Sequence, residues 1–297
     1  MPELPEVQTT VTGLKSKVLD RTFVDVWSDW SKIIKKPKSF LEFKKEIKNK
    51  KIKTIWRRAK NIIFDLSGGY SLLIHQKMTG HLLVGEWILK DLPAWAGKKW
   101  QPKKEGSLND PYNRFIHLIF FLDDKNMLAL SDVRKFAKVE LWETKKLLDS
   151  EVFKKIGPEP LDKDFTFKKF QEVLKNKKGK IKQVLMDQSI IAGIGNIYAS
   201  ESLWQARINP EKEAFKLSDK ELKNLYQSIK KVLLLSIKLG GESFSDYRKP
   251  DGSKGGFDSE RRVYKREGQK CHRCGSKIKR IKIGQRSTFF CPVCQKR

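Results

Sequence analysis

The four cysteines constrain the fold of the chain most, because all of them lie within its last 27 residues. Cys271 and Cys274 form one Cys-x2-Cys pair, Cys291 and Cys294 form a second, and 16 residues separate the two pairs. Two thiolate pairs at this spacing are typical of a tetrahedral zinc site. Four sulfur ligands leave no open coordination position, so the sequence predicts one structural Zn2+ rather than a catalytic metal. A redox-active cysteine pair is the alternative interpretation.

The charge of the chain indicates a polyanionic partner. Its 63 lysines and arginines exceed its 35 aspartates and glutamates, which gives a formal net charge of +28. Nucleic acid is the first candidate and an anionic membrane the second. The segment between Cys271 and Cys294 holds several basic residues and no acidic one, which favours phosphate binding over a merely solvated basic face.

The pattern of apolar residues argues against the membrane. No stretch approaches ~18 uncharged apolar residues, and no basic, apolar leader opens the chain. Cysteines that cluster as metal ligands also suit a reducing compartment better than a disulfide framework would. We therefore expect no membrane partner, a cytoplasmic location and, since the sequence carries no oligomeric signal, a monomer.

The hydrophobic pattern changes along the chain, and 297 residues fit two domains better than one. From about Phe23 to Trp142, short apolar runs alternate with turn signals, which predicts an antiparallel β-sandwich. Residues 90–113 lack this pattern and are interpreted as a long surface loop. A helix is predicted at the start of the chain from apolar residues at helical spacing, namely Val7, Val11, Leu14 and Val18.

Helical patterns dominate after a segment with two prolines at 156–162. The last helix has a capping box, Ser218 with Glu221, and Gly240 marks its end. The predicted fold is therefore α+β: an N-terminal β-sandwich with flanking helices and a C-terminal helical domain. The expected ranges are 1–150 for the sandwich domain, 151–162 for a linker, 163–264 for the helical domain with a mobile glycine-rich loop at 241–258, and 265–297 for the zinc finger.

The N-terminus offers a nucleophile. Pro2 follows the initiator methionine, and a small second residue favours removal of Met1, which exposes a secondary amine. Such an amine titrates ~2 units below a lysine, and it can attack a sugar C1′ to form an iminium that promotes elimination of the 3′-phosphate. Glu3 and Glu6 lie beside it and could move protons. The alternative is a purely structural helix start, with Pro2 before the helix and two acids favoured by the helix dipole.

Several motifs together resemble the formamidopyrimidine-DNA glycosylase family. They are PELPE at the start, RRAK at 57–60, DVRKF at 132–136, GIGNIYASE at 193–201 and the four-cysteine finger. The matches are spread in order over nearly the whole chain. The resemblance implies a bifunctional repair enzyme that removes 8-oxoguanine and ring-opened formamidopyrimidines and then cuts the strand by β,δ-elimination. It also implies a helix–two-turn–helix motif in the helical domain and duplex DNA bound in the cleft between the domains.

The resemblance assigns five catalytic roles. It makes Pro2 the Schiff-base nucleophile, Glu3 the general acid/base and Glu6 a support for the N-terminal site. Lys60 in RRAK matches a lysine near the scissile phosphate; without the resemblance, it would be interpreted as a solvated charge. Arg286 matches the finger arginine that holds the phosphates flanking the lesion.

The resemblance also implies DNA contacts in the helical domain. Asn196 matches an asparagine that binds phosphate, and it could cap a helix at the same time. Lys178 and Lys182 match basic positions near the damaged nucleotide. Tyr247 matches a position that contacts phosphate, within the 241–258 loop that caps the everted base.

The space left by an everted base must be filled, since the duplex otherwise closes again. The family uses a methionine, an arginine and a phenylalanine, which Met78, Arg134 and Phe136 match; singly, Met78 and Phe136 would be interpreted as core residues. His75 matches a histidine that contacts phosphate.

The chain also departs from the family pattern at two positions. Phe115 stands where the family often has the first histidine of a His-x-His pair, of which His117 is the second. Ala137 replaces a usual glycine. The missing histidine puts one DNA contact of the family in doubt.

Two other functions remain as alternatives. An endonuclease VIII-like glycosylase for oxidised pyrimidines is disfavoured by Leu4 and by the wedge residues. A non-catalytic zinc-ribbon DNA-binding protein would leave Pro2, Glu3 and Lys60 unexplained. The expected partner is double-stranded DNA that contains oxidised purines or abasic sites, in a bacterial-type cytoplasm and associated with the nucleoid.

Overall fold

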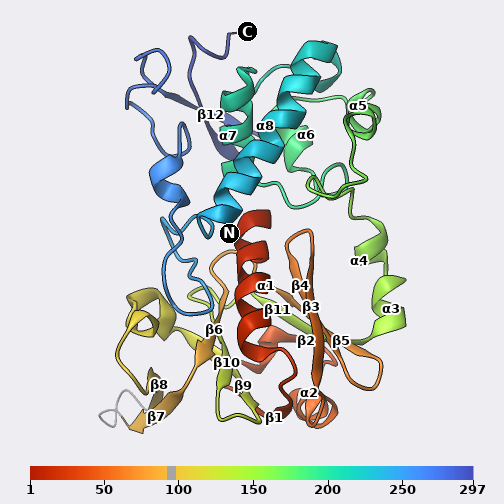
Figure 1. Ribbon diagram of the computed structural model, residues 1–297, viewed down its shortest axis with the longest axis vertical. Helices are drawn as coiled ribbons and strands as arrows, with labels where there is room; N and C mark the ends of the chain where they lie inside the picture. The colour runs from red at the N-terminus through yellow and green to blue at the C-terminus, as the bar shows by residue number, and fades with distance from the viewer. Residues whose placement is uncertain (92–97, 297) are drawn as a thin grey trace. The chain divides into compact units, whose positions relative to one another are not determined.

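The computed structural model describes residues 1–91 and 98–296 (Figure 1). Its contacts divide the chain into two units. The N-terminal unit comprises Met1–Phe153 and Gly240–Gly256, and the helical unit comprises Lys154–Leu239 and Phe257–Arg297. Among the described residues, no helix is both long and apolar enough to cross a membrane.

The N-terminal unit opens with helix α1 (Leu4–Val18), as the apolar spacing predicts. Pro5 lies in the first turn, where its missing N–H group costs no hydrogen bond. One face of α1 is fully buried through Val7, Val11, Leu14 and Val18. This face joins the hydrophobic core of the sandwich, so α1 is held by packing along its whole length.

Two sheets form the predicted sandwich. The first has the order β1-β9-β10-β6 and is antiparallel throughout. The second has the order β2-β11-β5-β4-β3, in which only the β2–β11 pair is parallel. The strands are β1 (Phe23–Ser28), β2 (Ile34–Lys36), β3 (Ile52–Arg58), β4 (Asn61–Leu66), β5 (Tyr70–His75), β6 (His81–Gly85), β9 (Ile116–Leu122), β10 (Met127–Ser131) and β11 (Lys138–Glu143).

The core lies between these sheets. Phe23, Phe120 and Leu130 from the first sheet belong to the same buried cluster as Phe64 and Ile74 from the second. Helix α2 (Phe40–Ile47) adds Phe43 and Ile47 to this cluster. Burial of these side chains supplies the main driving force for the unit, because each large apolar side chain contributes about 1.5–3 kcal/mol.

The prediction of a long surface loop at 90–113 is wrong for much of that segment. Strands β7 (Trp87–Asp91) and β8 (Lys98–Pro102) pair as an antiparallel ribbon, and Ser107–Asn109 and Pro111–Arg114 are 3-10 helices. The ribbon is mostly exposed. Its strands therefore carry no apolar alternation that sequence reasoning could detect. Residues 92–97 lie outside the described part of the chain.

The segment between the units contains more structure than a linker. Helices α3 (Thr144–Leu148) and α4 (Glu151–Lys154) precede the prolines, and Leu147 and Phe153 pack beneath the second sheet with Ile63 and Leu73. The contacts divide between Phe153 and Lys154. The start of the expected 151–162 linker thus packs against the N-terminal unit.

The helical unit contains helices α5 (Phe167–Leu174), α6 (Ile181–Met186), α7 (Asn196–Ala206) and α8 (Asp219–Lys238). Ser218 and Glu221 form the predicted capping box of α8, and Gly240 follows its end with φ +80°. The terminal hairpin consists of β12 (Lys279–Ile283) and β13 (Arg286–Phe290). Short 3-10 turns occur at Ser31–Ile33 in the N-terminal unit and at Ala214–Lys216 and Phe257–Glu260 in the helical unit. The architecture is α+β, as predicted.

The 241–258 loop differs from its expected grouping. The sequence placed it with the helical domain, whereas the contacts place Gly240–Gly256 with the N-terminal unit. The reason is that its hydrogen bonds reach α1, β6 and the 3-10 turns near residue 110. We call Gly240–Gly256 the docked loop.

Candidate active site and nucleic-acid contacts

The first turn of α1 brings Pro2, Glu3 and Glu6 together in a buried setting. Glu3 is the N-cap, and Glu3 and Glu6 are only 2% and 1% exposed. The Glu3 backbone N–H donates to Glu6 Oε2 at 2.8 Å, and the Glu242 N–H donates to Glu6 Oε1 at 2.9 Å. Both oxygens of Glu6 are therefore fixed by backbone donors, directly after Pro2.

The docked loop closes over the same turn. Gly241 has φ +82°, and a Cβ atom there would lie 3.1 Å from both Cγ and Oε1 of Glu6. The Tyr247 hydroxyl donates to the Glu6 carbonyl oxygen at 3.0 Å and lies 3.4 Å from Thr10 Oγ1. Tyr247, predicted at a phosphate-contacting position, thus lies buried against α1. Burial raises the pKa of Tyr247, so the hydroxyl stays protonated as a donor.

The β3–β4 turn carries Lys60, whose side chain is buried within the N-terminal unit. Ala59 in this turn has φ +52°, and Arg57 holds it by donating to the Ala59 carbonyl oxygen at 3.0 Å and to Gln8 Oε1 of α1 at 3.1 Å. The RRAK motif is thereby tied to the helix that begins with the Pro2 site.

His75 ends β5, opposite Asn61 in the sheet. Its Nδ1 accepts the Lys77 backbone N–H at 3.0 Å, so in the neutral ring Nε2 carries the hydrogen. Burial, together with Lys77 and Lys60, lowers the pKa of His75 to about 3. His75 therefore offers a neutral N–H donor.

The wedge residues occupy two neighbouring turns. Met78 is half-buried in the turn after β5, whereas Arg134 and Phe136 are exposed in the turn between β10 and β11. Phe136 is 50% exposed, and the Arg134 guanidinium lies 4.5 Å from the centre of its ring. An exposed aromatic ring beside a cation suits a group that stacks against bases.

Buried Asp132 holds the wedge turn, a role that sequence reasoning missed. Its carboxylate accepts the Ala137 N–H at 2.8 Å, the Arg134 N–H at 3.3 Å and the Thr79 hydroxyl. The aspartate belongs to the DVRKF motif, so its position was visible. Its partner Thr79 lies far away in sequence, and no local pattern could reveal that contact.

Asn196 is the first residue of α7, and the N-cap is Gly195, so the alternative in which Asn196 caps the helix is wrong. The Asn196 side-chain amide donates to the Ser287 carbonyl oxygen of β13 at 3.0 Å. Asn196 therefore ties the start of α7, the positive end of the helix dipole, to the zinc-finger hairpin.

Lys178 and Lys182 are placed differently. Lys178 is exposed between α5 and α6. Lys182 is fully buried, and its amino group donates to the Asn196 carbonyl oxygen at 2.7 Å and to Ser200 Oγ at 2.6 Å. In this structure Lys182 fixes the first turn of α7 against α6.

The four cysteine sulfurs converge at the base of the β12–β13 hairpin. All of them lie within 4.8 Å of one another, and none forms a disulfide. This donor set fits a structural zinc ion held by Cys271, Cys274, Cys291 and Cys294. Arg286 is exposed at the start of β13, at the tip of the hairpin.

Buried Glu201 of α7 is a second residue that sequence reasoning missed. Its carboxylate accepts the backbone N–H groups of Arg262, Val263 and Tyr264 at 2.8, 3.0 and 2.7 Å. It thereby fastens the segment that leads into the zinc finger. The glutamate stands in the GIGNIYASE motif, and that motif was the only available signal.

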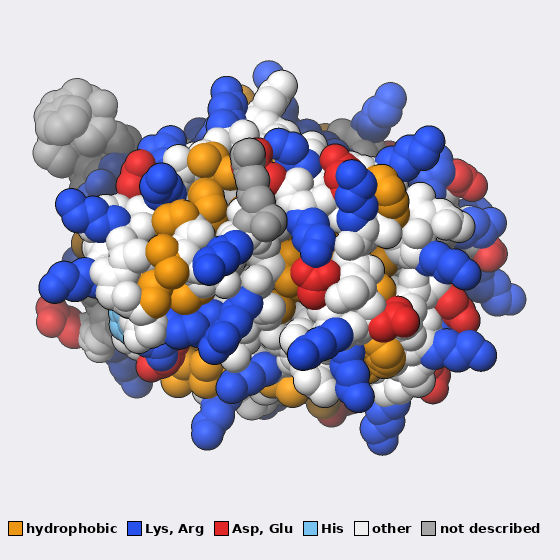
Figure 2. All heavy atoms as spheres, turned by 90° about the horizontal axis from the view of Figure 1, so that it is seen from above, with side chains coloured by type: hydrophobic (Ala, Val, Ile, Leu, Met, Phe, Trp, Pro, Cys, Tyr) orange, Lys and Arg blue, Asp and Glu red, His pale blue; other side chains and the backbone are white. Residues whose placement is uncertain are grey.

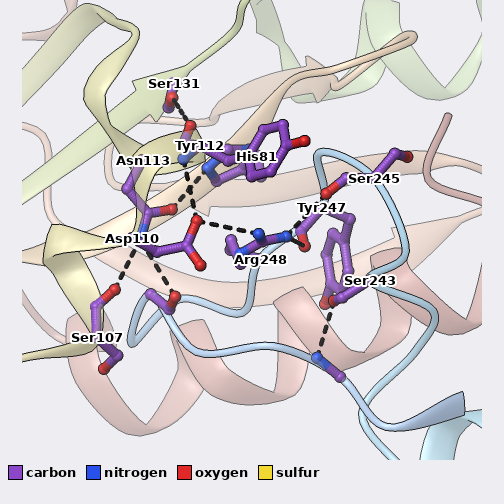
Figure 3. Close-up of polar contacts among 12 residues, drawn as sticks. His81, Ser107, Asp110, Tyr112, Asn113, Ser131, Ser243, Ser245, Tyr247 and Arg248 are labelled. Atoms are coloured by element: carbon purple, nitrogen blue, oxygen red, sulfur yellow. Dashed lines mark hydrogen bonds and ion pairs between the residues drawn. The ribbon is translucent and has the colours of Figure 1, made fainter. Parts of the chain in front are cut away.

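A buried polar network joins the docked loop to the rest of the N-terminal unit (Figure 3). Arg248 pairs with Asp110 at 3.0 Å, and the Asn113 amide donates to the Gly252 carbonyl oxygen at 3.2 Å. Asn113 Oδ1 lies 3.0 Å from His81 Nε2. Burial lowers the pKa of His81 to about 4, so this ring is neutral at physiological pH.

Figure 2 shows lysine and arginine side chains spread over the face that it presents, with fewer acidic side chains interspersed among them. Together with the net charge of +28, this surface favours a nucleic-acid backbone as the partner.

Comparisons with known proteins place the chain in one family. The formamidopyrimidine-DNA glycosylase N-terminal domain matches residues 1–139, the H2TH domain of the same glycosylase matches residues 156–248, and a zinc finger found in FPG and IleRS matches residues 268–297. Formamidopyrimidine-DNA glycosylases from Ligilactobacillus salivarius and Chloroflexus aggregans are each 38% identical, over 99% of this chain and 99% and 98% of their own lengths.

Solved structures of the Lactococcus lactis enzyme are similar to this chain over nearly its whole length. The wild-type Lactococcus lactis enzyme in complex with DNA containing N7-benzyl-Fapy-dG is 36% identical with a TM-score of 0.84, and both chains are covered fully. The same enzyme in complex with abasic-site DNA is 35% identical with a TM-score of 0.84, over 99% of this chain and 100% of that one. Matches of this extent show that the chain belongs to the formamidopyrimidine-DNA glycosylase family.

Proposed function

We propose that this DNA repair glycosylase and AP lyase removes formamidopyrimidine and 8-oxoguanine bases from duplex DNA through a Schiff base on Pro2. The solved relatives support this substrate class, since they were captured with DNA that contains Fapy-dG, an abasic site or a carbocyclic 8-oxo-G. The observation that carries the Pro2 mechanism is the buried first turn of α1, where Pro2 precedes two buried carboxylates, of which Glu6 is fixed by two backbone donors.

The chemistry follows from a secondary amine at this position. After loss of Met1, the Pro2 nitrogen attacks C1′ while the bond from C1′ to the base breaks, and the base leaves with a proton. Loss of the N–H proton and opening of the sugar ring, with a proton given to O4′, produce an iminium cation. Glu3 is the group that we assign to these proton transfers, because it adjoins Pro2 in the buried turn.

The iminium then drives strand cleavage. It withdraws electrons from C2′, a base removes the C2′ proton, and the 3′-phosphate leaves; a second elimination releases the 5′-phosphate. We assign Glu6 the support of this site, since both of its oxygens accept backbone N–H groups.

Cations and amides of both units suit the phosphates of the bound strand. We assign Lys60 to the scissile phosphate, and Arg286 and Lys178 to phosphates held by the helical unit. We assign His75 to a phosphate as a neutral N–H donor, and we assign Asn196 to a phosphate at the N-terminal end of α7. We propose that Met78, Arg134 and Phe136 fill the space left by the everted base, because Arg134 and Phe136 are exposed on a turn fixed by Asp132.

The four cysteines would hold zinc, which here supplies structure and no reaction step. We further propose that the protein works as a monomer on the nucleoid of a bacterial cytoplasm. The high positive charge supports the association with DNA, and one chain supplies every residue assigned above.

Borohydride trapping on an 8-oxoguanine:cytosine duplex tests the proposal, after mass spectrometry has verified that Met1 is absent. We expect a covalent adduct that maps to Pro2, because borohydride reduces the iminium to a stable amine. Pro2→Gly should bind the duplex as tightly as the wild type but lose most of the trapping, since it lacks the constrained secondary amine.

Two further duplexes separate the alternatives. A clear preference for thymine glycol over 8-oxoguanine would indicate an enzyme for oxidised pyrimidines and overturn the proposed substrate. Failure to trap even on an abasic-site duplex, with zinc-loaded protein that lacks Met1, would overturn the Schiff-base mechanism and leave a DNA-binding protein.

A further inference from the structure

The docked loop is attached to the first turn of α1 by three contacts. The Glu242 N–H donates to Glu6 Oε1 at 2.9 Å, and the Tyr247 hydroxyl donates to the Glu6 carbonyl oxygen at 3.0 Å. Gly241 approaches the Glu6 side chain so closely that a Cβ atom would be 3.1 Å from it. One residue of the active-site helix, Glu6, therefore receives the loop through both its side chain and its backbone.

A second attachment lies on the other side of Tyr247. Arg248 is the largest fully buried side chain of the chain's described residues, and it pairs with Asp110 at 3.0 Å (Figure 3). The Val84 N–H donates to the Pro250 carbonyl oxygen at 2.8 Å, and the Pro250 ring lies against Gly13 of α1. Tyr247 is thus held between two anchored points, and its hydroxyl has little freedom to leave Glu6.

The Glu6 carbonyl oxygen, which accepts the Tyr247 hydroxyl, lies inside α1 and has another hydroxyl donor. The Val11 side of α1 packs in the core, and Thr10 Oγ1 also donates to the Glu6 carbonyl oxygen, at 2.8 Å. Two hydroxyl donors on one carbonyl oxygen restrain the first turn of the helix at Glu6. The turn then fixes the Glu3 N–H, which is bonded to Glu6 Oε2 and follows Pro2 directly.

We propose that Tyr247 is a positioning residue for the Pro2 nucleophile, acting through Glu6 from the docked loop. The inference rests on the proposed function, because it assumes that Pro2 is the attacking group. It replaces the expected phosphate contact of Tyr247: the side chain is 5% exposed and its hydroxyl is engaged with α1. Loosening Tyr247 should slow attack by Pro2 without weakening DNA binding.

Tyr247→Phe tests this directly, since it removes only the hydroxyl group. The assay is single-turnover borohydride trapping on an abasic-site duplex, together with the Kd for the same duplex. We expect the trapping rate constant to fall about 3- to 10-fold, in line with the loss of one hydrogen bond that orients the reacting group. The Kd should stay within about twofold of the wild-type value.

Tyr226→Phe is the matched control. The Tyr226 hydroxyl donates to the Phe165 carbonyl oxygen at 2.7 Å within the helical unit, so this variant loses a similar hydrogen bond outside the unit that contains Pro2. It should trap at the wild-type rate. A second variant, Asp110→Asn, weakens the other attachment of the loop and should slow trapping in the same direction as Tyr247→Phe.

The outcomes are distinct. Wild-type protein that fails to trap would contradict the proposed function itself. Wild-type protein that traps, with Tyr247→Phe at the same rate, would overturn the positioning role. A Tyr247→Phe variant that traps normally at saturating DNA but binds several-fold more weakly would overturn the positioning role and support the phosphate contact that the resemblance implies. If Tyr247→Phe fails to fold, an unchanged rate in Asp110→Asn would be the result that overturns the inference.

Discussion

At the scale of single residues, buried polar groups of the N-terminal unit are placed by partners far away in sequence. His81 is the clearest titratable example: it is fully buried, and its Nε2 lies 3.0 Å from Asn113 Oδ1. Burial lowers the pKa of His81 to about 4, well below the 6.5 of an exposed histidine. At pH values between these two pKa values, His81 is therefore neutral in the folded protein and protonated in the unfolded chain.

This difference in pKa predicts acid sensitivity. Because the unfolded chain binds more protons between about pH 6.5 and 4, the free energy of unfolding falls as the pH drops through this window, by up to about 3 kcal/mol from His81. Urea unfolding of His81→Gln at several pH values between 7.5 and 4.5 should show a shallower fall than the wild type. Equal slopes in the two proteins would contradict the prediction.

At the scale of elements, the sequence predicts the helices and strands whose pattern lies in neighbouring residues. Helix α1 and the sandwich strands were predictable, because apolar spacing and short apolar runs are local patterns. The β7–β8 ribbon was missed since its strands are exposed. The motifs indicated Pro2 and the cysteines, but they could not reveal the place of Tyr247, whose partner Glu6 is 241 positions away.

Glu201 shows how one side chain can join elements. It lies inside α7 and accepts three backbone N–H groups from the segment before the zinc finger. Tyr264 of that segment packs edge-on against Phe289 of the β13 strand, with ring centres 5.4 Å apart. The position of the finger on α7 therefore depends on a carboxylate with acceptor capacity on both oxygens.

Glu201→Gln should loosen this junction. The glutamine amide presents N–H donors where an oxygen accepted them, so at least one buried donor loses its partner at a cost of about 1–3 kcal/mol. We expect a lower melting temperature of the helical unit and faster hydrogen exchange at the Val263 and Tyr264 amides. Glu172→Gln, at an exposed position of α5, is the matched control. Unchanged exchange at these two amides would show that Glu201 does not hold the segment.

At the scale of the whole molecule, each unit has a core of its own. The N-terminal core contains side chains from α1 and both sheets. A separate cluster in the helical unit contains Trp204 of α7, Val263, Phe289 and two of the cysteines, Cys271 and Cys291. The zinc site is thus part of the packing on α7, and Gln295 reinforces it by donating to the Ile208 carbonyl oxygen at 2.8 Å.

Removal of the metal should therefore affect the two units unequally. Cys294→Ser deletes one of four sulfur ligands, and structural zinc contributes folding free energy directly. We expect loss of zinc, early proteolysis of the terminal hairpin and a DNA affinity lower by about tenfold or more, ~1.4 kcal/mol, because Arg286 and the Ser287 partner of Asn196 belong to that hairpin. The N-terminal unit should keep its proteolytic resistance, since its core contains no residue of the finger.

The control is Val293→Ser, a change at an exposed position between Cys291 and Cys294, which should retain zinc and bind DNA normally. DNA affinity that stayed at the wild-type value after verified metal loss would mean that the finger does not contribute to binding.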